Sequence, residues 1–345
     1  MNKQATSTPR VISFGELMLR LDAPSGQRLV KPSHLLSHYG GSEANVCVVL
    51  AQLGIAAQLV TAVPDNPIGK GAVAELDSLS VDTRGILLQG ERMGIYFHEP
   101  GNGIRPSKIY YDREYSSFSQ LTFAQHDWTR LMQNQDWLHW SGITPALGEN
   151  SASLCRSVLA AARTKGLRIS ADLNYRSTLW KYGKTPKEVM PELLQHCELI
   201  NGDLEALQMY LGIQTDPASP PGQQFESAAQ QLRKLLPNTK VLAMSFRDQT
   251  PEGHMTYQGA LHTEGKSFFT ETYVLSRVTD RIGSGDAFMA GLIYGVINQE
   301  AAHKTIAVAT ACAILKHAVW GDFLRIDKTE IDEFLKNGLS YKVTR

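Results

Sequence analysis

The sequence has no excess of charge of either sign. Lysine plus arginine and aspartate plus glutamate each number 34 among the 345 residues, so the formal net charge at pH 7 is zero. Proteins that bind nucleic acid or anionic membranes through their overall charge carry a clear basic excess. We therefore expect no nucleic-acid partner and no membrane partner. An anionic ligand would therefore have to be bound by a local cluster of cationic side chains.

Cysteine is scarce, and its spacing predicts no shared site. No C-x-x-C pair occurs, and the ten histidines show no metal-ligand spacing, so neither a zinc site nor a redox dithiol is predicted. No apolar run reaches the length of a membrane span, and residues 1–10 lack the apolar core of a secretory signal. We expect a cytoplasmic protein in which four cysteines are small buried side chains: Cys47, Cys155, Cys197 and Cys312.

The chain is rich in alternating strand-like and helix-like segments. It is 43% apolar and 20% charged, which suits a packed core, and we find no internal repeat. Buried strands alternate with helices, the last of them at about 285–297, 303–316 and 328–336. This alternation predicts a mostly parallel sheet with helices on both faces. We expect one α/β domain over residues 11–345.

Two segments depart from this rhythm and predict a small second sheet. Residues 94–99 and 107–114 alternate around a glycine-rich turn at 100–103, which indicates a β-hairpin. Residues 11–21 are predicted as one strand that leaves the buried sheet after Glu16. We expect a lid built from about 15–38 and 92–120. A sheet with an exposed face tends to pair with a copy of itself, so we also expect a homo-oligomer formed through the lid.

A first glycine turn opens a helix near residue 42. Gly40 and Gly41 precede Ser42, which is the expected helix cap, and Gly54 is the expected stop. The paired glycines either let a polyhydroxylated ligand approach the backbone or form an ordinary strand-to-helix turn.

A second glycine turn, Asp280–Asp286, runs directly into an apolar helix. Gly283 and Gly285 allow the backbone to approach a ligand closely. The first turn of a helix offers unpaired N–H groups and favours negative charge. Asp286 lies at the same place and is suited to accept a hydroxyl proton during phosphoryl transfer. The alternative is a carboxylate that only interacts with the helix dipole.

Polar side chains follow several predicted strands, at the sheet edge where ligands of parallel α/β proteins collect. They lie at 172–176, 201–205 and 316–322. Asn201 and Glu205 are four residues apart and can share a helix face. Their oxygens suit Mg²⁺, directly or through water, although a plain helix start also explains them.

Together these segments resemble the ribokinase-like (PfkB-type) carbohydrate kinases, and within them the kinases of 2-keto-3-deoxygluconate. The resemblance runs from Val11 to about Phe323. It is carried by Gly40–Asn45, Tyr111–Arg113, Asp172–Arg176 with Leu179-Trp180, Asn201–Glu205, Asp280–Asp286 and Gly321-Asp322. It implies a three-layer α/β/α core with a mostly parallel sheet and a β lid. It also implies ATP and Mg²⁺ as ligands, with a monovalent cation as a further candidate.

The resemblance assigns roles residue by residue. Asp286 is the expected base, and the amides of Gly283, Ser284 and Gly285 are the expected anion hole. Asn201 and Glu205 resemble the magnesium and phosphate element, and Ser245 is placed at the nucleotide. The expected sugar contacts are Gly41, Asn45, Tyr96, Tyr111, Arg113, Asn174, Arg176 and Asp322.

An acidic sugar also fits the residues themselves. A carboxylate is bound well by the planar fork of arginine, and Arg113 and Arg176 are expected to supply it from two sides. Alternatively, Arg113 forms a salt bridge with Asp112 or Glu114. The expected reaction is phosphorylation of 2-keto-3-deoxygluconate at its 6-hydroxyl. The alternatives are a kinase of 2-keto-3-deoxygalactonate or of a neutral ketose such as fructose, and a kinase-like protein that only binds sugar.

The chain departs from the family pattern in several places. Ser284 stands where alanine is more usual, and Arg281 where many relatives have threonine. Residues 244–247 lack the glycine of the common nucleotide loop, so adenine contacts are not assigned. No Walker A sequence occurs.

Overall fold

The computed structural model describes residues 8–101 and 105–339. The polar start of the chain and the glycine turn expected at 100–103 therefore lie partly outside the described residues.

The main sheet is mostly parallel, as predicted. Seven parallel strands lie in the order β5-β4-β1-β8-β9-β10-β11, and β12, β13 and β14 extend the β11 edge in antiparallel fashion. Their bounds are β1 Arg10–Phe14, β4 Ala56–Val63, β5 Asp82–Leu88, β8 Trp137–Ser141, β9 Arg168–Asp172, β10 Leu199–Asn201, β11 Val241–Gln249, β12 Met255–Thr263, β13 Lys266–Phe269 and β14 Tyr273–Leu275.

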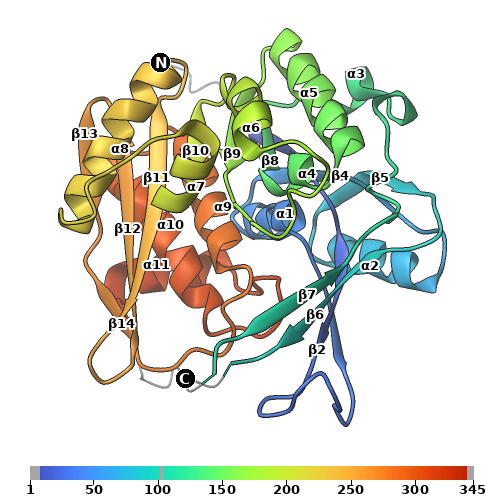
Figure 1. Ribbon diagram of the computed structural model, residues 1–345, viewed down its shortest axis with the longest axis horizontal. Helices are drawn as coiled ribbons and strands as arrows, with labels where there is room; N and C mark the ends of the chain where they lie inside the picture. Colours follow the sequence, from blue (N-terminus) through green and yellow to red (C-terminus); the bar gives the residue numbers. More distant parts are fainter. Residues whose placement is uncertain (1–7, 102–104, 340–345) are drawn as a thin grey trace.

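Helices cover both faces of this sheet (Figure 1). Alternate strand residues point to opposite faces, so Val11 of β1 joins one core cluster and Ile12 joins the other. The helices are α1 Ser42–Gln52, α2 Pro67–Ser78, α3 Trp128–Leu131, α4 Ile143–Ala146, α5 Glu149–Thr164, α6 Pro186–Leu194, α7 Leu204–Leu211, α8 Pro221–Leu235, α9 Ser284–Ile297, α10 Ala302–Lys316 and α11 Lys328–Asn337.

A four-stranded sheet forms the lid. Its order is β3 (Leu36–Gly40), β2 (Met18–Asp22), β6 (Gly94–Glu99) and β7 (Lys108–Asp112). Figure 1 shows these blue and teal strands projecting beside the main sheet. The prediction of a single strand over 11–21 was wrong. The chain leaves the main sheet after Phe14, and β2 begins a second sheet at Met18. The alternation after Glu16 reflects this second sheet, because β2 buries one face more deeply than the other.

Five strands were not predicted: β3, β5, β12, β13 and β14. Four of these (β3, β5, β13 and β14) lie at sheet edges, where side chains are partly exposed and hydrophobic patterning is weak. The four cysteines are buried and free, as expected. Within residues 8–101 and 105–339, no helix is both long enough and apolar enough to cross a membrane.

Candidate active site

A cavity of about 1340 Å³ lies between the lid sheet and the carboxyl ends of the parallel strands. Lid residues such as Met18, Tyr96 and Tyr111 line one side, and the strand-end residues Asp172 and Asn201 line the other. Single-ligand pockets commonly have about 300–1,000 Å³. This cavity therefore has room for a sugar and a nucleotide together.

The loop Asp280–Gly283 shapes the floor of this cavity. Gly283 is the residue before α9 and has φ 82°, in the left-handed region that glycine adopts readily. A Cβ atom there would lie 2.3 Å from the carbonyl oxygen of Asp322, so the close approach of the two segments also requires glycine. The Asp280 carboxylate accepts a hydrogen bond from the Ile282 N–H at 3.0 Å and fixes the turn. Gly285 would carry its Cβ into open space, which leaves the backbone accessible there.

Asp286 lies in the first turn of α9, and its carboxylate is held on both oxygens. Oδ1 accepts a hydrogen bond from Ser42 Oγ at 2.8 Å, and Oδ2 accepts one from Asn45 Nδ2 at 2.7 Å. Burial raises the pKa of Asp286, while these two hydrogen bonds act in the opposite direction. The carboxyl group also lines the cavity. This arrangement can accept a proton from a hydroxyl group placed there.

Ser42 does not act as the cap of α1, so that prediction was wrong. Gly41 is the residue before the helix, and Ser42 is its first helical residue. The hydroxyl group is turned to Asp286, and it also accepts a hydrogen bond from Asn174 Nδ2 at 3.3 Å. Asn174 itself has φ 40°, a conformation that asparagine tolerates better than most residues.

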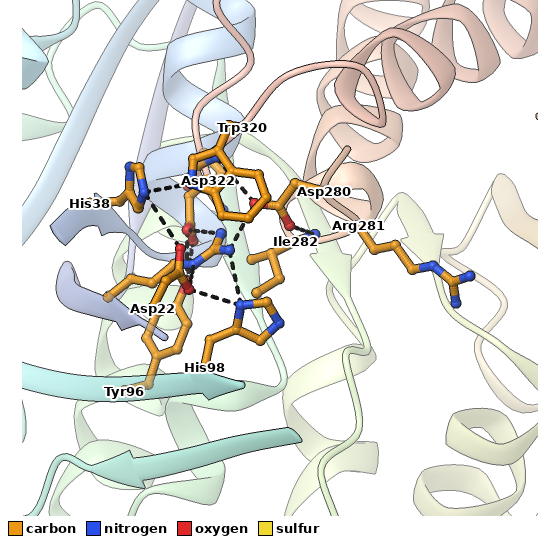
Figure 2. Close-up of polar contacts among 12 residues, drawn as sticks. Asp22, His38, Tyr96, His98, Asp280, Arg281, Ile282, Trp320 and Asp322 are labelled. Carbon is orange, nitrogen blue, oxygen red and sulfur yellow. Dashed lines mark hydrogen bonds and ion pairs between the residues drawn. The ribbon is translucent and has the colours of Figure 1, made fainter. Parts of the chain in front are cut away.

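The lid is joined to the cavity floor through Arg20, a residue that the sequence did not single out. Its guanidinium pairs with Asp22 at 2.7 Å, Asp280 at 2.8 Å and Asp322 at 3.1 Å, and it has no exposed surface. Asp22 and His98 from the lid meet Asp280 and Asp322 in Figure 2.

Asp322 belongs to this charge cluster and lines the cavity, as Asp280 and His98 also do. The Tyr96 hydroxyl donates to its carboxylate, at 2.7 Å from Oδ1 and 2.6 Å from Oδ2. Asp280 accepts a further hydrogen bond from the Gly321 N–H at 3.1 Å. In Figure 2 the Arg281 side chain points away from the cluster, and it lines the cavity.

The two arginines expected to bind a carboxylate are in different situations. Arg176 is exposed and lines the cavity, with Nη1 donating to the Tyr175 carbonyl oxygen at 2.9 Å. Arg113 is buried and pairs with Glu16, and it is not among the described residues that line the cavity. The structure therefore brings only Arg176 of this pair to the site. Glu16 is thus the salt-bridge partner of Arg113, in place of the neighbouring Asp112 or Glu114 that the sequence suggested.

Cationic side chains nevertheless gather around the cavity, although the whole chain has no net charge. Arg105 reaches it from the lid hairpin and pairs with Glu99. Arg247 of β11 also lines it and donates to Ser245 Oγ at 3.2 Å. With Arg176 and Arg281 they form the local cluster that an anionic ligand requires.

The candidate magnesium residues are only partly brought together. Asn201 ends β10 and lines the cavity, whereas Glu205 is exposed and lies outside the described lining. Asp203 is the cap of α7, because its Oδ1 accepts from the Ala206 N–H at 2.7 Å, and it also lines the cavity. Glu205 is the second residue of α7. In the described part of the chain no three His, Cys, Asp or Glu side chains form a metal cluster.

Asp172 is a further buried carboxyl group at the end of β9. Burial and the nearby Asp286 raise its pKa to about 8. The remaining predicted residues all line the cavity: Gly41, Asn45, Tyr96, Tyr111, Asn174, Ser245, Gly283, Ser284, Gly285, Asp286 and Asp322.

Comparison with known proteins gives one family over most of the chain. The family described as pfkB family carbohydrate kinase matches residues 8–317. A 2-dehydro-3-deoxygalactonokinase from Haloferax volcanii is 27% identical over 96% of this chain and 98% of its own length. The crystal structure of 2-dehydro-3-deoxygluconokinase from Thermotoga maritima has a TM-score of 0.90 and 32% identity, and the match covers 95% of this chain and all of that one.

A more distant structure shares the fold alone. It is a putative ribokinase II from E. coli in complex with ATP and Mg²⁺, with a TM-score of 0.77 and 18% identity over 95% of this chain and 99% of that one. These likenesses confirm the predicted ribokinase-like α/β fold with its small lid sheet.

Proposed function

We propose, from the premise that this chain belongs to the pfkB family of carbohydrate kinases, that it transfers the γ-phosphoryl group of ATP to the 6-hydroxyl of 2-keto-3-deoxygluconate. The proposal rests above all on the position of Asp286. Its carboxylate is held by Ser42 and Asn45 and faces a cavity with room for two ligands, beside the start of α9.

In the proposed reaction Asp286 takes the proton of the sugar's 6-hydroxyl as that oxygen bonds to the γ-phosphorus. The bond from the γ-phosphorus to the bridging oxygen breaks, and ADP leaves. Negative charge on the transferred group, and on the β-phosphate that it leaves, lies against the first-turn amides of α9, including that of Gly285. A raised pKa makes Asp286 a better proton acceptor, but its activity is lost as the pH falls through that pKa.

Mg²⁺ would neutralise charge on the phosphates of ATP. Asn201 and Asp203 would hold it, since they offer an amide oxygen and a carboxylate at the cavity wall. Such a small protein contribution is usual for this ion, which keeps water and phosphate oxygens as its other ligands. The E. coli structure was solved in complex with ATP and Mg²⁺, and we propose the same two ligands for this chain.

The substrate assignment rests on the arginines of the cavity. The carboxylate of a ketodeoxy sugar acid would pair with Arg176, whereas a neutral ketose has no charged group for this arginine. According to their names, the relatives from Haloferax volcanii and Thermotoga maritima both act on such acids. The galactonate epimer is therefore the second candidate substrate, favoured by the Haloferax relative.

A coupled assay of ADP release tests the proposal. The panel contains 2-keto-3-deoxygluconate, its galactonate epimer, fructose and ribose, each with ATP and Mg²⁺. We expect the two acids to be used with a much higher kcat/KM than the neutral sugars, and phosphorus NMR of the product to place the phosphate on C6. Preference for a neutral sugar would show that the acid assignment is wrong, and no turnover at all would favour a protein that only binds sugar.

We also propose that two copies associate through the outer face of the lid. Leu21, Phe97 and Tyr110 are aligned across β2, β6 and β7, and residues in register on neighbouring strands share a face. Tyr110 is 52% exposed. A second copy would cover this apolar row.

A further inference from the structure

Lys316 is a buried cation that the proposed reaction does not use. It is the last residue of α10, and it has no exposed surface. Lysine is almost never fully buried unless it is paired, because removing an ammonium group from water is costly. Its Nζ atom donates a hydrogen bond to the carbonyl oxygen of Val319 at 2.9 Å.

The side chain of Lys316 lies against the loop that begins α9. A Cβ atom on Gly283 would be 3.2 Å from Lys316 Cε. The segment after α10 is bound to the same loop by its main chain, since the Thr279 N–H donates to the His317 carbonyl oxygen at 2.7 Å. The Gly321 N–H donates to the Asp280 carboxylate at 3.1 Å, so a side chain of the loop also holds this segment. Lys316 is therefore packed among the contacts that hold Asp280–Gly283, which we call the anion loop because the proposed reaction places phosphate beside it.

The charges around this loop explain why a cation is needed there. Asp280, Asp286 and Asp322 are all buried, and all three act to raise the pKa of Lys316. Burial of the ammonium acts more strongly in the opposite direction, and the pKa is lowered. Three carboxylates beside a loop that receives phosphate would repel it. Arg20 offsets part of this charge through its pairs with Asp280 and Asp322.

We propose that Lys316 is a built-in monovalent cation that supports the anion loop, so that this enzyme needs no added potassium or sodium ion. An alkali-metal ion in this place would need the Val319 carbonyl oxygen and the space that Nζ occupies. The inference rests on the proposed phosphoryl transfer at this loop. A purely structural lysine, placed only to interact with the C-terminal end of α10, is the competing explanation.

The first test uses the unmodified protein. Initial rates are measured in potassium chloride, sodium chloride and tetramethylammonium chloride at equal ionic strength, with Mg²⁺ and ATP fixed. We expect the rates to agree within about twofold, since every salt screens charge alike at equal ionic strength. A rate that rises with potassium to a saturating value many times the tetramethylammonium rate would overturn the proposal.

The second test removes the ammonium group. Lys316→Ala is compared with Lys304→Ala, which changes an exposed lysine on the same helix. ADP binding is followed by calorimetry and folding by thermal melting, each in tetramethylammonium, potassium and ethylammonium chloride. We expect Lys316→Ala to lose about tenfold or more in ADP affinity and kcat, in line with the loss of a charge-stabilising group. Potassium or ethylammonium should restore part of both and raise the melting temperature, and Lys304→Ala should respond as the wild type does.

The possible results separate this inference from the proposed function. If the Lys316→Ala protein melts cooperatively and keeps wild-type ADP affinity, or loses it without recovery in either cation, Lys316 is not the supporting cation. If Lys316→Ala does not fold, Lys316→Arg takes its place, and it should keep activity without any requirement for potassium. If the wild type phosphorylates no sugar, the proposed function fails, while the ADP and melting measurements still test Lys316.

Discussion

Asn45 of α1 donates a hydrogen bond to the Asp286 carboxylate of α9 over 2.7 Å, although 241 residues separate them in the chain. The first turns of two helices therefore meet at one side chain. Ser42 completes the arrangement from the same turn of α1. The glycine turns at the start of both helices thus serve one site, because each brings its helix start to the cavity. Two features that are weak signals when taken alone therefore meet at the residue that we propose as the base.

Asp286→Asn should nearly abolish catalysis and spare sugar binding. The amide keeps the size of the carboxylate but cannot accept the hydroxyl proton, so we expect kcat to fall by about 10²- to 10⁴-fold. The dissociation constant of the sugar, measured by calorimetry, should change only a few-fold. The matched control is Asp332→Asn on α11, which changes an exposed aspartate. A variant that retained most of its kcat would show that Asp286 is not the base.

Arg176→Ala and Arg113→Ala should affect different quantities. Loss of a charged hydrogen bond to the sugar carboxylate costs about 1.5–3 kcal/mol, so Arg176→Ala should raise KM for the acid about 10- to 100-fold. Arg113→Ala leaves Glu16 buried without its charged partner, which typically costs about 3–5 kcal/mol of unfolding free energy. Steady-state kinetics and urea unfolding separate the two effects. The exposed Arg130→Ala is the control, and equal effects of Arg113 and Arg176 on KM would contradict the assignment.

Much of the main domain could be predicted from the sequence because its signals are local. The late helices were placed within about two residues of α9, α10 and α11, since helix-like segments of this length can be recognised without any distant partner. The hairpin β6–β7 was recognised from alternation in the same way. Edge strands such as β5 and β13 were missed because their side chains are partly exposed and their pattern is weak.

The pairing of charges could not be predicted, because it depends on distant segments. Arg113 meets Glu16, 97 positions away, and so leaves the cavity to Arg176. Arg20 meets Asp322, 302 positions away, and nothing in the short alternating strand around it indicates this partner. The one available signal was the charge itself, since Arg20 occupies the same face of its strand as Met18 and Asp22. A charge on an inward face requires a partner.

Arg20→Lys should weaken the connection between the lid and the cavity floor. The substitution keeps the charge but removes the fork that contacts Asp22, Asp280 and Asp322 at once. We expect lower stability and a fall in kcat, because Asp280 orders the anion loop. KM for ATP and kcat are measured together with the melting temperature. Arg84→Lys, at an exposed pair with Asp82, should leave all three unchanged. An Arg20→Lys enzyme with normal kcat but reduced stability would show that Arg20 only stabilises the fold.

Phe97→Glu should dissociate the proposed dimer. The substitution places a charge in the apolar row formed with Leu21 and Tyr110 on the outer face of the lid. Light scattering coupled to size-exclusion chromatography should give a dimer for the wild type and a monomer for the variant. The control, Lys266→Glu, changes an exposed residue at the start of β13, outside the lid, and should keep the wild-type mass. A monomeric wild type would refute the proposal directly.

Asp172 should make the protein less stable as the pH rises from about 4 to about 8. Its pKa in the folded protein is about 8, mainly because of burial, whereas that of an unfolded aspartate is about 3.9. Between these values the folded state binds the extra proton, so the contribution of Asp172 is fully present below the lower pKa and is lost as the pH approaches the upper one. Urea unfolding without ligands at several pH values measures this contribution as wild type minus Asp172→Asn. The difference should decline with rising pH and level off above about 8, while the difference for Asp332→Asn should show no such decline. A difference that grew with pH would mean that Asp172 is ionised in the folded protein.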